Sequence, residues 1–341
     1  MVKLSFVGNP IREAPSRPIG VLMALAVGFD RVAAKPVLII PPLLLDLFLW
    51  LGPHLTIPSI FQPLISVFSV PAGAELEQVR YIQALQQWLT ELGEGWNLFA
   101  ALSSFPVKLP SLMAGRIFLS TPLGKVLGVS IDNPVAILVS WAGLILIGLG
   151  FGALFHRWIA QQVAPEAQLS SGWRAWGRIL LFAVLVLIGL FVISWVTLFI
   201  TSVLSALIGV VGLGLVIIGF SILFWAIVYL WFTPHGIIRY RFGVVQAMVE
   251  SIYLVRWNLF STISFLLTSF GITYLSTQVW LLPSENSWFS ILAMVGHAFV
   301  GATLLAASYA FYQGRHAWLE QMKLKLTPSR VGGDNQTGSG D

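Results

Sequence analysis

The chain contains no cysteine among its 341 residues. This absence excludes disulfide bonds, cysteine-ligated zinc, iron–sulfur clusters and thiol nucleophiles. The sequence also lacks the HExxH, GxSxG and Walker A motifs. We therefore expect no catalytic, cofactor-binding or metal-binding residues, and we predict that the protein is not an enzyme.

Charged residues are scarce, at 10% of the chain against about 25% in soluble domains. Residues of the AVILMFWYC set make up 57%, and the mean hydropathy is +0.85. This composition leaves too little polar surface to cover a globule in water, so lipid must be the solvent for much of the chain. The composition argues against an ordinary cytosolic enzyme. The pI of 9.6 does not imply nucleic-acid binding, because the placement of charges in a membrane protein reflects its orientation.

The clearest apolar run covers residues 179–234, which contain no Asp, Glu, Lys, Arg, His, Asn or Gln. About 20 residues cross a bilayer as a helix, so this run predicts two spans. Thr201, Ser202 and Ser205 are the polar residues near its middle, and we expect the turn there.

Hydropathy predicts an all-α integral membrane protein with a bundle of six transmembrane helices. We expect Pro41 and Pro42 to kink or break the first span, because they remove two backbone donors. The predicted spans are 36–53, 134–155, 179–201, 206–233, 259–281 and 289–312.

Basic residues predict that both termini are cytoplasmic, because fifteen of the 19 lie on one side of this topology. The tail after residue 312 is expected to be disordered from about residue 327, where Gly, Ser, Asn and Asp dominate. The fifteen are Lys3, Arg12, Arg17, Arg31, Lys35, Arg157, Arg174, Arg178, Arg239, Arg241, Arg256, Arg315, Lys323, Lys325 and Arg330.

Two amphipathic segments, 20–35 and 243–256, predict interfacial helices on the cytoplasmic side, each leading into a span. Alignment of the two segments places identical residues at four positions, which suggests an internal repeat. The expected apolar stripe of the first is Leu22, Leu25, Phe29 and Val32, and that of the second is Met248, Ile252 and Val255.

The outer loop, residues 54–131, is too long and too apolar for a free linker. We expect it to form an outer helical cap on the bundle and to dip partly into the outer interface. Its middle predicts an amphipathic helix over about 74–92. The expected seam of that helix is Tyr81, Leu85, Trp88 and Leu92.

The histidines and the small residues favour structural interpretations. We interpret His156, His235 and His316 as interfacial polar residues at span ends, rather than as metal ligands. The spacing of Gly148 and Gly152 indicates close helix packing. The same holds for a small-residue stripe on the sixth span, formed by Ala298, Ala302, Ala306 and Ala310.

Asp46 and His297 are the two ionisable residues predicted within spans, and such residues are the first candidates for function in membrane proteins. The two spans run in opposite directions, which places both residues at nearly the same depth below the outer surface. We hypothesise that they form an intramembrane polar pair within hydrogen-bonding or one-water distance. The alternative is a structural role, in which Asp46 hydrogen-bonds to Ser or Thr neighbours and these bonds join helices.

The segment Gly243-Val-Val-Gln-Ala-Met-Val-Glu-Ser251 and Leu254-Val-Arg-Trp-Asn258, which leads into a span, resembles uncharacterised bacterial multi-pass membrane proteins. These proteins are similar to the membrane domain attached to some glycerophosphodiester phosphodiesterases. The segments 29–31, 41–46 and 105–114 resemble the same group. The resemblance implies a six-helix bundle in the bacterial cytoplasmic membrane, with amphipathic helices leading into spans, and brings no catalytic residues.

The most consistent functional hypothesis is a non-enzymatic accessory or assembly factor that binds a membrane-protein partner or an anionic lipid. A small-solute or proton-coupled transporter with Asp46 and His297 in its path is the first alternative. A membrane-embedded lipid enzyme is the second. A water-filled cavity lined by Asp46 would favour transport, whereas a dry bundle with an exposed apolar outer patch would favour binding.

Overall fold

The computed structural model describes residues 18–70, 73–207 and 211–326. Of these described residues, 77% are helical and very few lie in strands. Within the described residues, five helices are long and apolar enough to cross a membrane, or six if one bent helix pair forms a single span. The predictions of an all-α chain and of membrane helices are confirmed at this level. The predicted disordered tail, 327–341, lies outside the described residues.

The long helices extend beyond their predicted cytoplasmic ends. α5 continues to Val163 and α11 to Leu326, whereas the predictions ended at 155 and 312. Hydropathy marks only the apolar part of a helix, while its backbone hydrogen bonds continue into polar sequence. These helices are α5 (Pro134–Val163), α6 (Gly172–Leu207), α7 (Val211–Leu230), α10 (Leu259–Trp280) and α11 (Ser290–Leu326).

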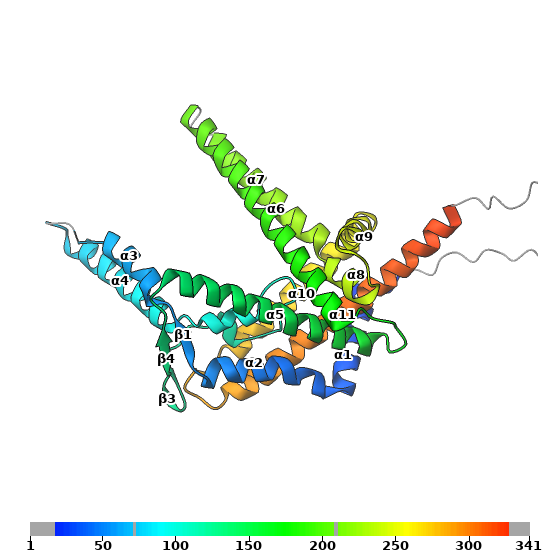
Figure 1. Cartoon of the computed structure of the whole chain (residues 1–341), viewed down its shortest axis with the longest axis horizontal. Helices are drawn as coiled ribbons and strands as arrows, with labels where there is room; N and C mark the ends of the chain where they lie inside the picture. Colours follow the sequence, from blue (N-terminus) through cyan, green and yellow to red (C-terminus); the bar gives the residue numbers. More distant parts are fainter. Residues whose placement is uncertain (1–17, 71–72, 208–210, 327–341) are drawn as a thin grey trace, which may run out of the picture.

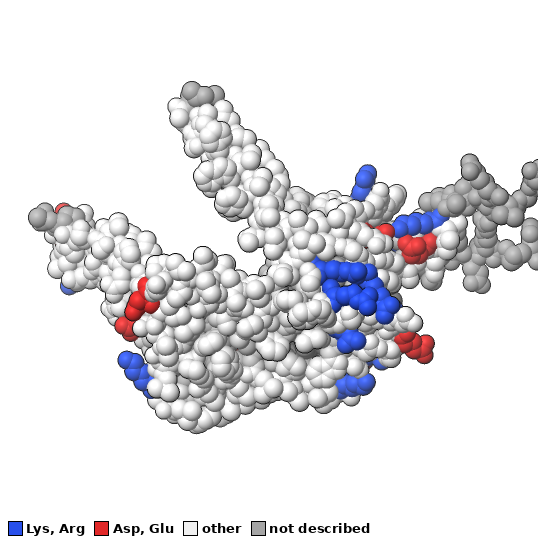
Figure 2. Space-filling model, viewed as in Figure 1, with Lys and Arg blue, Asp and Glu red and all other residues white. Residues whose placement is uncertain are grey.

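Helices α6 and α7 form a hairpin that projects away from the other long helices (Figure 1). The projecting part of the hairpin shows no charged side chain on the face in Figure 2. The turn predicted at Thr201–Ser205 is wrong, because α6 continues to Leu207 and α7 begins at Val211. Ser202 Oγ donates a hydrogen bond to the Phe199 carbonyl oxygen at 2.9 Å, so the helix itself satisfies this hydroxyl.

The break expected at Pro41 and Pro42, inside the predicted span 36–53, is wrong: the chain bends before Pro36, between this span and the predicted interfacial helix 20–35. α1 (Val21–Ala34) and the segment formed by η1 (Pro36–Ile39) and α2 (Ile40–Leu51) are bent by 97°. The bend lies at Lys35, with φ −137° and ψ 72°, because a residue before proline is driven out of the helical region. Pro41 and Pro42 lie in the first turn of α2, where backbone N–H groups have no acceptor within the helix, so their absence breaks no helical hydrogen bond.

The two predicted interfacial segments form α1 and α9 (Val244–Trp257), each of 14 residues after a glycine N-cap. Their buried positions correspond along the helix. The shared buried positions are Ala24, Gly28 and Val32 in α1 and Ala247, Ser251 and Val255 in α9. The structure thus repeats this helix, followed in each case by an apolar helix. α8 (Thr233–Arg239) links α7 to α9.

The predicted apolar stripes of the amphipathic helices are only partly buried: Val32 and Val255 are buried, but several large stripe residues face outward. Leu22 is 79% exposed and Phe29 52%, while the neighbouring small residues of α1 pack against α11. Tyr81 and Trp88, from the predicted seam in the outer loop, are exposed as well. The reason is that lipid is as apolar as a large side chain, so helices in membranes associate through small residues.

The outer loop has its own secondary structure. β1 (His54–Thr56) pairs in parallel with β4 (Gly128–Ser130), His54 opposite Gly128, and this pairing joins the two ends of the loop. α3 (Pro58–Val67) and α4 (Leu76–Gly95) pack together and project from the bundle (Figure 1). The remaining elements are η2 (Leu98–Leu102), η3 (Met113–Gly115), β2 (Ser120–Thr121) and β3 (Gly124–Lys125).

The part of the outer loop between η2 and η3 enters the helix bundle; we refer to residues 105–113 as the inserted segment. Val107 and Leu109 are buried in the main core, with residues of α5 and α11. A Cβ at Gly148 would lie 2.5 Å from the Leu102 carbonyl oxygen, and one at Gly152 would clash with the Val107 carbonyl oxygen. The two glycines therefore pack against loop backbone, and the predicted helix–helix contact is wrong.

We predict that Gly152→Ala lowers the thermal unfolding midpoint of the detergent-solubilised protein. The added methyl group has no space beside Val107, and overpacking of this kind costs about 1–3 kcal/mol. The matched control is Gly143→Ala on the same helix, where nothing lies within 4 Å of the new methyl group. This control should keep or raise the midpoint, because alanine is the better helix former. Equal midpoints for the two variants would contradict the packing.

Candidate functional site

A cavity of about 490 Å³ runs along α10 and α11 and is closed at one end by the inserted segment. Its other walls come from the ends of α6 and α7, from α8, and from one residue of α5, His156. His297 and Ser308 both line the cavity and are 11 residues apart on α11, which corresponds to about 16 Å along the helix. The cavity is therefore elongated in the direction of the bundle.

Most of the lining is apolar, and the polar groups are grouped by position. Lys108 and Arg116 lie at the end formed by the outer loop. His156, His235 and Ser308 lie at the opposite end, near α8. Between them, α10 contributes four hydroxyl groups, from Ser269, Thr273, Ser276 and Thr277. The cavity thus has a cationic end, an apolar body with hydroxyl groups along one wall, and a histidine end.

Four buried polar atoms in this lining have no hydrogen-bond partner among the described residues: Arg116 Nη1, Ser269 Oγ, His297 Nδ1 and His235 Nδ1. A buried donor or acceptor left unpaired costs about 1–3 kcal/mol, so native proteins pair nearly all of them. All four belong to one cavity and are spread along its length. A bound molecule or ordered water in the cavity would satisfy them, which makes this cavity the candidate functional site.

Arg116 is held in place by an ion pair. Its Nη2 donates to Glu285 Oε1 at 2.6 Å, and its side chain is only 12% exposed. The second terminal nitrogen, Nη1, remains available to a ligand. Lys108 is exposed, and it makes no ion pair within the described part of the chain. The outer end of the cavity therefore carries one positive charge that Glu285 does not balance.

The histidine end of the cavity was not expected from the sequence. His235 Nε2 lies 2.7 Å from Ser308 Oγ, and the Tyr309 hydroxyl lies 3.4 Å from His156 Nδ1. His156 and His235 are both buried within the protein, and their predicted position at the membrane interface stays a prediction. The signal was missed because the four residues come from α5, α8 and α11. The residue numbers alone do not show that these parts of the three helices meet.

Asp46 does not line the cavity but holds one of its walls. Its carboxylate accepts hydrogen bonds from Ser111 Oγ at 2.5 Å, from the Leu112 N–H at 3.1 Å and from the Met113 N–H at 2.9 Å. Ser111 and Leu112 belong to the cavity lining. No direct hydrogen bond joins Asp46 to His297, which lines the cavity separately. These contacts favour the alternative in which Asp46 hydrogen-bonds to a serine neighbour and joins parts of the fold.

One further histidine lies just outside the spans, at the start of the outer loop. His54 Nε2 is 3.0 Å from the Leu49 carbonyl oxygen. The imidazole ring packs edge-on against the Phe118 ring, with the ring centroids 5.0 Å apart. Burial lowers the pKa of the His54 imidazole below its ordinary value, so the ring is neutral at pH 7. Its role is to tie the outer loop to the end of α2.

Comparison with known proteins adds no homologue to this description. No family model, no curated protein and no solved structure matches the chain. The functional interpretation therefore rests on the cavity and its chemistry.

We predict that Asp46→Ala lowers the unfolding midpoint more than Asp46→Asn does. Alanine leaves the buried N–H groups of Leu112 and Met113 without an acceptor, at about 1–3 kcal/mol each, whereas the asparagine oxygen can still accept one. Limited proteolysis should also cut the Asp46→Ala variant near residues 105–116. Asp30→Ala, an exposed aspartate on α1, is the control and should change neither measurement. Unchanged stability of Asp46→Ala would contradict this role.

Proposed function

We propose that this membrane protein binds an anionic, lipid-like molecule in the cavity. Its apolar part would lie between α10 and α11, and its anionic group would contact Arg116 and Lys108. The observation that carries the proposal is the set of four unpaired polar atoms spread along one elongated, mainly apolar cavity.

The size and lining of the cavity support an amphipathic ligand. A volume of about 490 Å³ lies within the range of about 300–1,000 Å³ found for sites that bind small molecules. An apolar wall about 16 Å long favours a hydrocarbon chain, because a small hydrophilic solute could not satisfy such a surface. The hydroxyl groups of α10 and the imidazole of His297 can hydrogen-bond to ester or glycerol oxygens along the same path.

The outer end of the cavity supports an anionic group on the ligand. Arg116 is oriented by Glu285 and keeps one terminal nitrogen for a second acceptor, a geometry that suits phosphate or carboxylate. Lys108 supplies the net positive charge. Anionic lipid headgroups are recognised by basic pockets of this kind between membrane helices.

The same geometry favours binding over transport or catalysis. Asp46, the acidic residue expected in a transport path, is used in holding the inserted segment. Ser308 is hydrogen-bonded to His235, as a nucleophile would be, but it lies inside α11, and its hydroxyl also donates to the Leu305 carbonyl oxygen at 2.8 Å. Backbone N–H groups inside a helix are already bonded, so they offer no oxyanion hole beside Ser308.

We also propose the finer membrane arrangement. The bent pair of α1 and α2 counts as the sixth span-forming unit, and the outer loop forms the cap of the bundle. Lys and Arg side chains gather at the end of the bundle that contains α8 (Figures 1 and 2). This supports a cytoplasmic location for that end of the bundle in a bacterial inner membrane. The cationic end of the cavity then belongs to the outer half of the bundle.

We predict that native mass spectrometry of the purified protein finds one phosphatidylglycerol bound per chain in preference to phosphatidylethanolamine. The double variant Lys108→Gln, Arg116→Gln should reduce the affinity for phosphatidylglycerol about tenfold or more, since a hydrogen bond to a charged group contributes about 1.5–3 kcal/mol. Ser269→Phe should reduce the binding of both lipids by filling the cavity.

Lys125→Gln is the matched control, because Lys125 is an exposed lysine of the same loop that does not line the cavity. It should bind phosphatidylglycerol like the wild type. Equal retention of anionic and zwitterionic lipid by the wild type, unaffected by Ser269→Phe, would overturn the proposal.

A further inference from the structure

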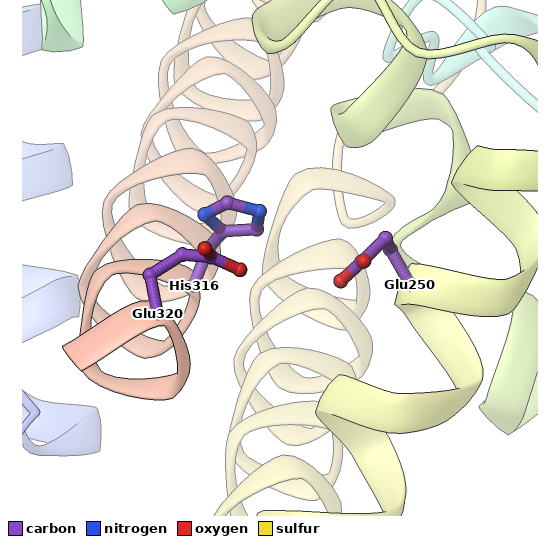
Figure 3. A group of neighbouring side chains, drawn as sticks. All are labelled: Glu250, His316 and Glu320. Atoms are coloured by element: carbon purple, nitrogen blue, oxygen red, sulfur yellow. The ribbon is translucent and has the colours of Figure 1, made fainter. Parts of the chain in front are cut away.

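Three potential metal ligands lie together outside the cavity, on the facing surfaces of α9 and α11. His316 and Glu320 are four residues apart on α11, which places them on the same face, and Glu250 comes from α9. One ligand atom from each lies within 4.8 Å of the other two. Figure 3 shows the Glu250 carboxylate directed toward the His316 ring and the Glu320 carboxylate. We refer to these three residues as the α9–α11 cluster.

His316 distinguishes this cluster from a surface group of acidic residues. The residue is only 9% exposed, and its buried Nε2 has no hydrogen-bond partner in the part of the chain that the structure describes. Its ring is stacked on Tyr240, with the ring centroids 4.1 Å apart, so its orientation is fixed. An imidazole held in this way, with an unused nitrogen beside two carboxylates, has the second feature that a metal site requires.

The charges around His316 also define what can bind. Lys323 Nζ lies 2.9 Å from Glu320 Oε1 and 3.4 Å from Glu250 Oε1, so an ammonium group is already attracted by both carboxylates. Arg239 is the other nearby cation, and its guanidinium lies 4.9 Å from the centre of the Tyr240 ring. The Lys323 side chain is 52% exposed and can turn into solvent when a stronger cation replaces its ammonium group.

We propose that Glu250, His316 and Glu320 form a binding site for a divalent transition-metal ion, with Zn²⁺ as the best fit. One imidazole nitrogen and two carboxylate oxygens are a ligand set that Zn²⁺ accepts at about 2.0–2.2 Å, with water in the fourth position. Ligand atoms around such an ion are about 3.4 Å apart, so separations of up to 4.8 Å must shorten by at most about 1.4 Å. Glu320 is exposed and Glu250 half-buried, so both carboxylates have room to move.

This site does not depend on the proposed lipid binding. The ion would join α9 to α11, and α9 leads through Asn258 directly into α10. The expected consequence is a metal-dependent gain in stability, because an ion that binds only the folded chain shifts the unfolding equilibrium.

The test uses the full chain without a polyhistidine tag, purified in detergent and stripped of metal by a chelator. Zn²⁺ is titrated in competition with a Zn²⁺-responsive dye, in the presence of excess Mg²⁺. We expect one Zn²⁺ per chain and a higher thermal unfolding midpoint with the ion bound. Glu250→Gln and His316→Gln should each weaken Zn²⁺ binding about tenfold or more. Glu77→Gln, an exposed glutamate of α4, should bind like the wild type.

Lys323→Met is the variant that keeps the proposal falsifiable if the other variants fold poorly. It removes the ammonium group that competes with the ion, and we expect Zn²⁺ to bind about tenfold more tightly. The proposal is overturned if the wild type binds no Zn²⁺ at unit stoichiometry. It is also overturned if Lys323→Met and Glu250→Gln leave the affinity unchanged.

Discussion

The bundle depends on the insertion of a non-helical backbone segment among its helices. Backbone N–H and C=O groups that leave a helix in an apolar interior need partners, since no water is at hand. Asp46 provides an acceptor for the N–H groups of Leu112 and Met113, and the Ser103 hydroxyl donates to the Leu109 carbonyl oxygen at 2.6 Å. Gly148 and Gly152 leave the space in which this backbone lies.

The cavity follows from that insertion. Without residues 105–113, the space between α10 and α11 would lack its outer wall and both of its cationic residues would be displaced. Asp46 is therefore connected to the cavity although it does not touch its interior. Asp46, the first candidate for function by residue type, hydrogen-bonds to residues 111–113, and in the proposed function Arg116 supplies the charge that contacts the ligand.

Lipid as the solvent explains both the long helices and the way they pack. Large apolar side chains such as Leu22 and Phe29 gain nothing from leaving lipid for protein, whereas small residues let helices approach closely. Gly28 of α1 lies directly against the backbone of Thr303 and Ala307 on α11. The four residues of the alanine stripe expected on the sixth span are all buried. The α9–α11 cluster and the cavity lie on different parts of α11, so the two proposed sites can be tested separately.

The sequence by itself determined the membrane-helix class, the approximate positions of five long helices, and the existence of α1, α4 and α9. Hydropathy and helical periodicity are local properties, because each can be read from the residues of a single segment. Tertiary structure decided which faces pack, since a local pattern does not reveal whether lipid or protein covers it. It also decided that Asp46 bonds to residues 111–113 and that His156, His235 and Ser308 meet. Glu250 joins His316 and Glu320 for the same reason. These contacts join segments far apart in the chain, and only the packing of the helices brings them together.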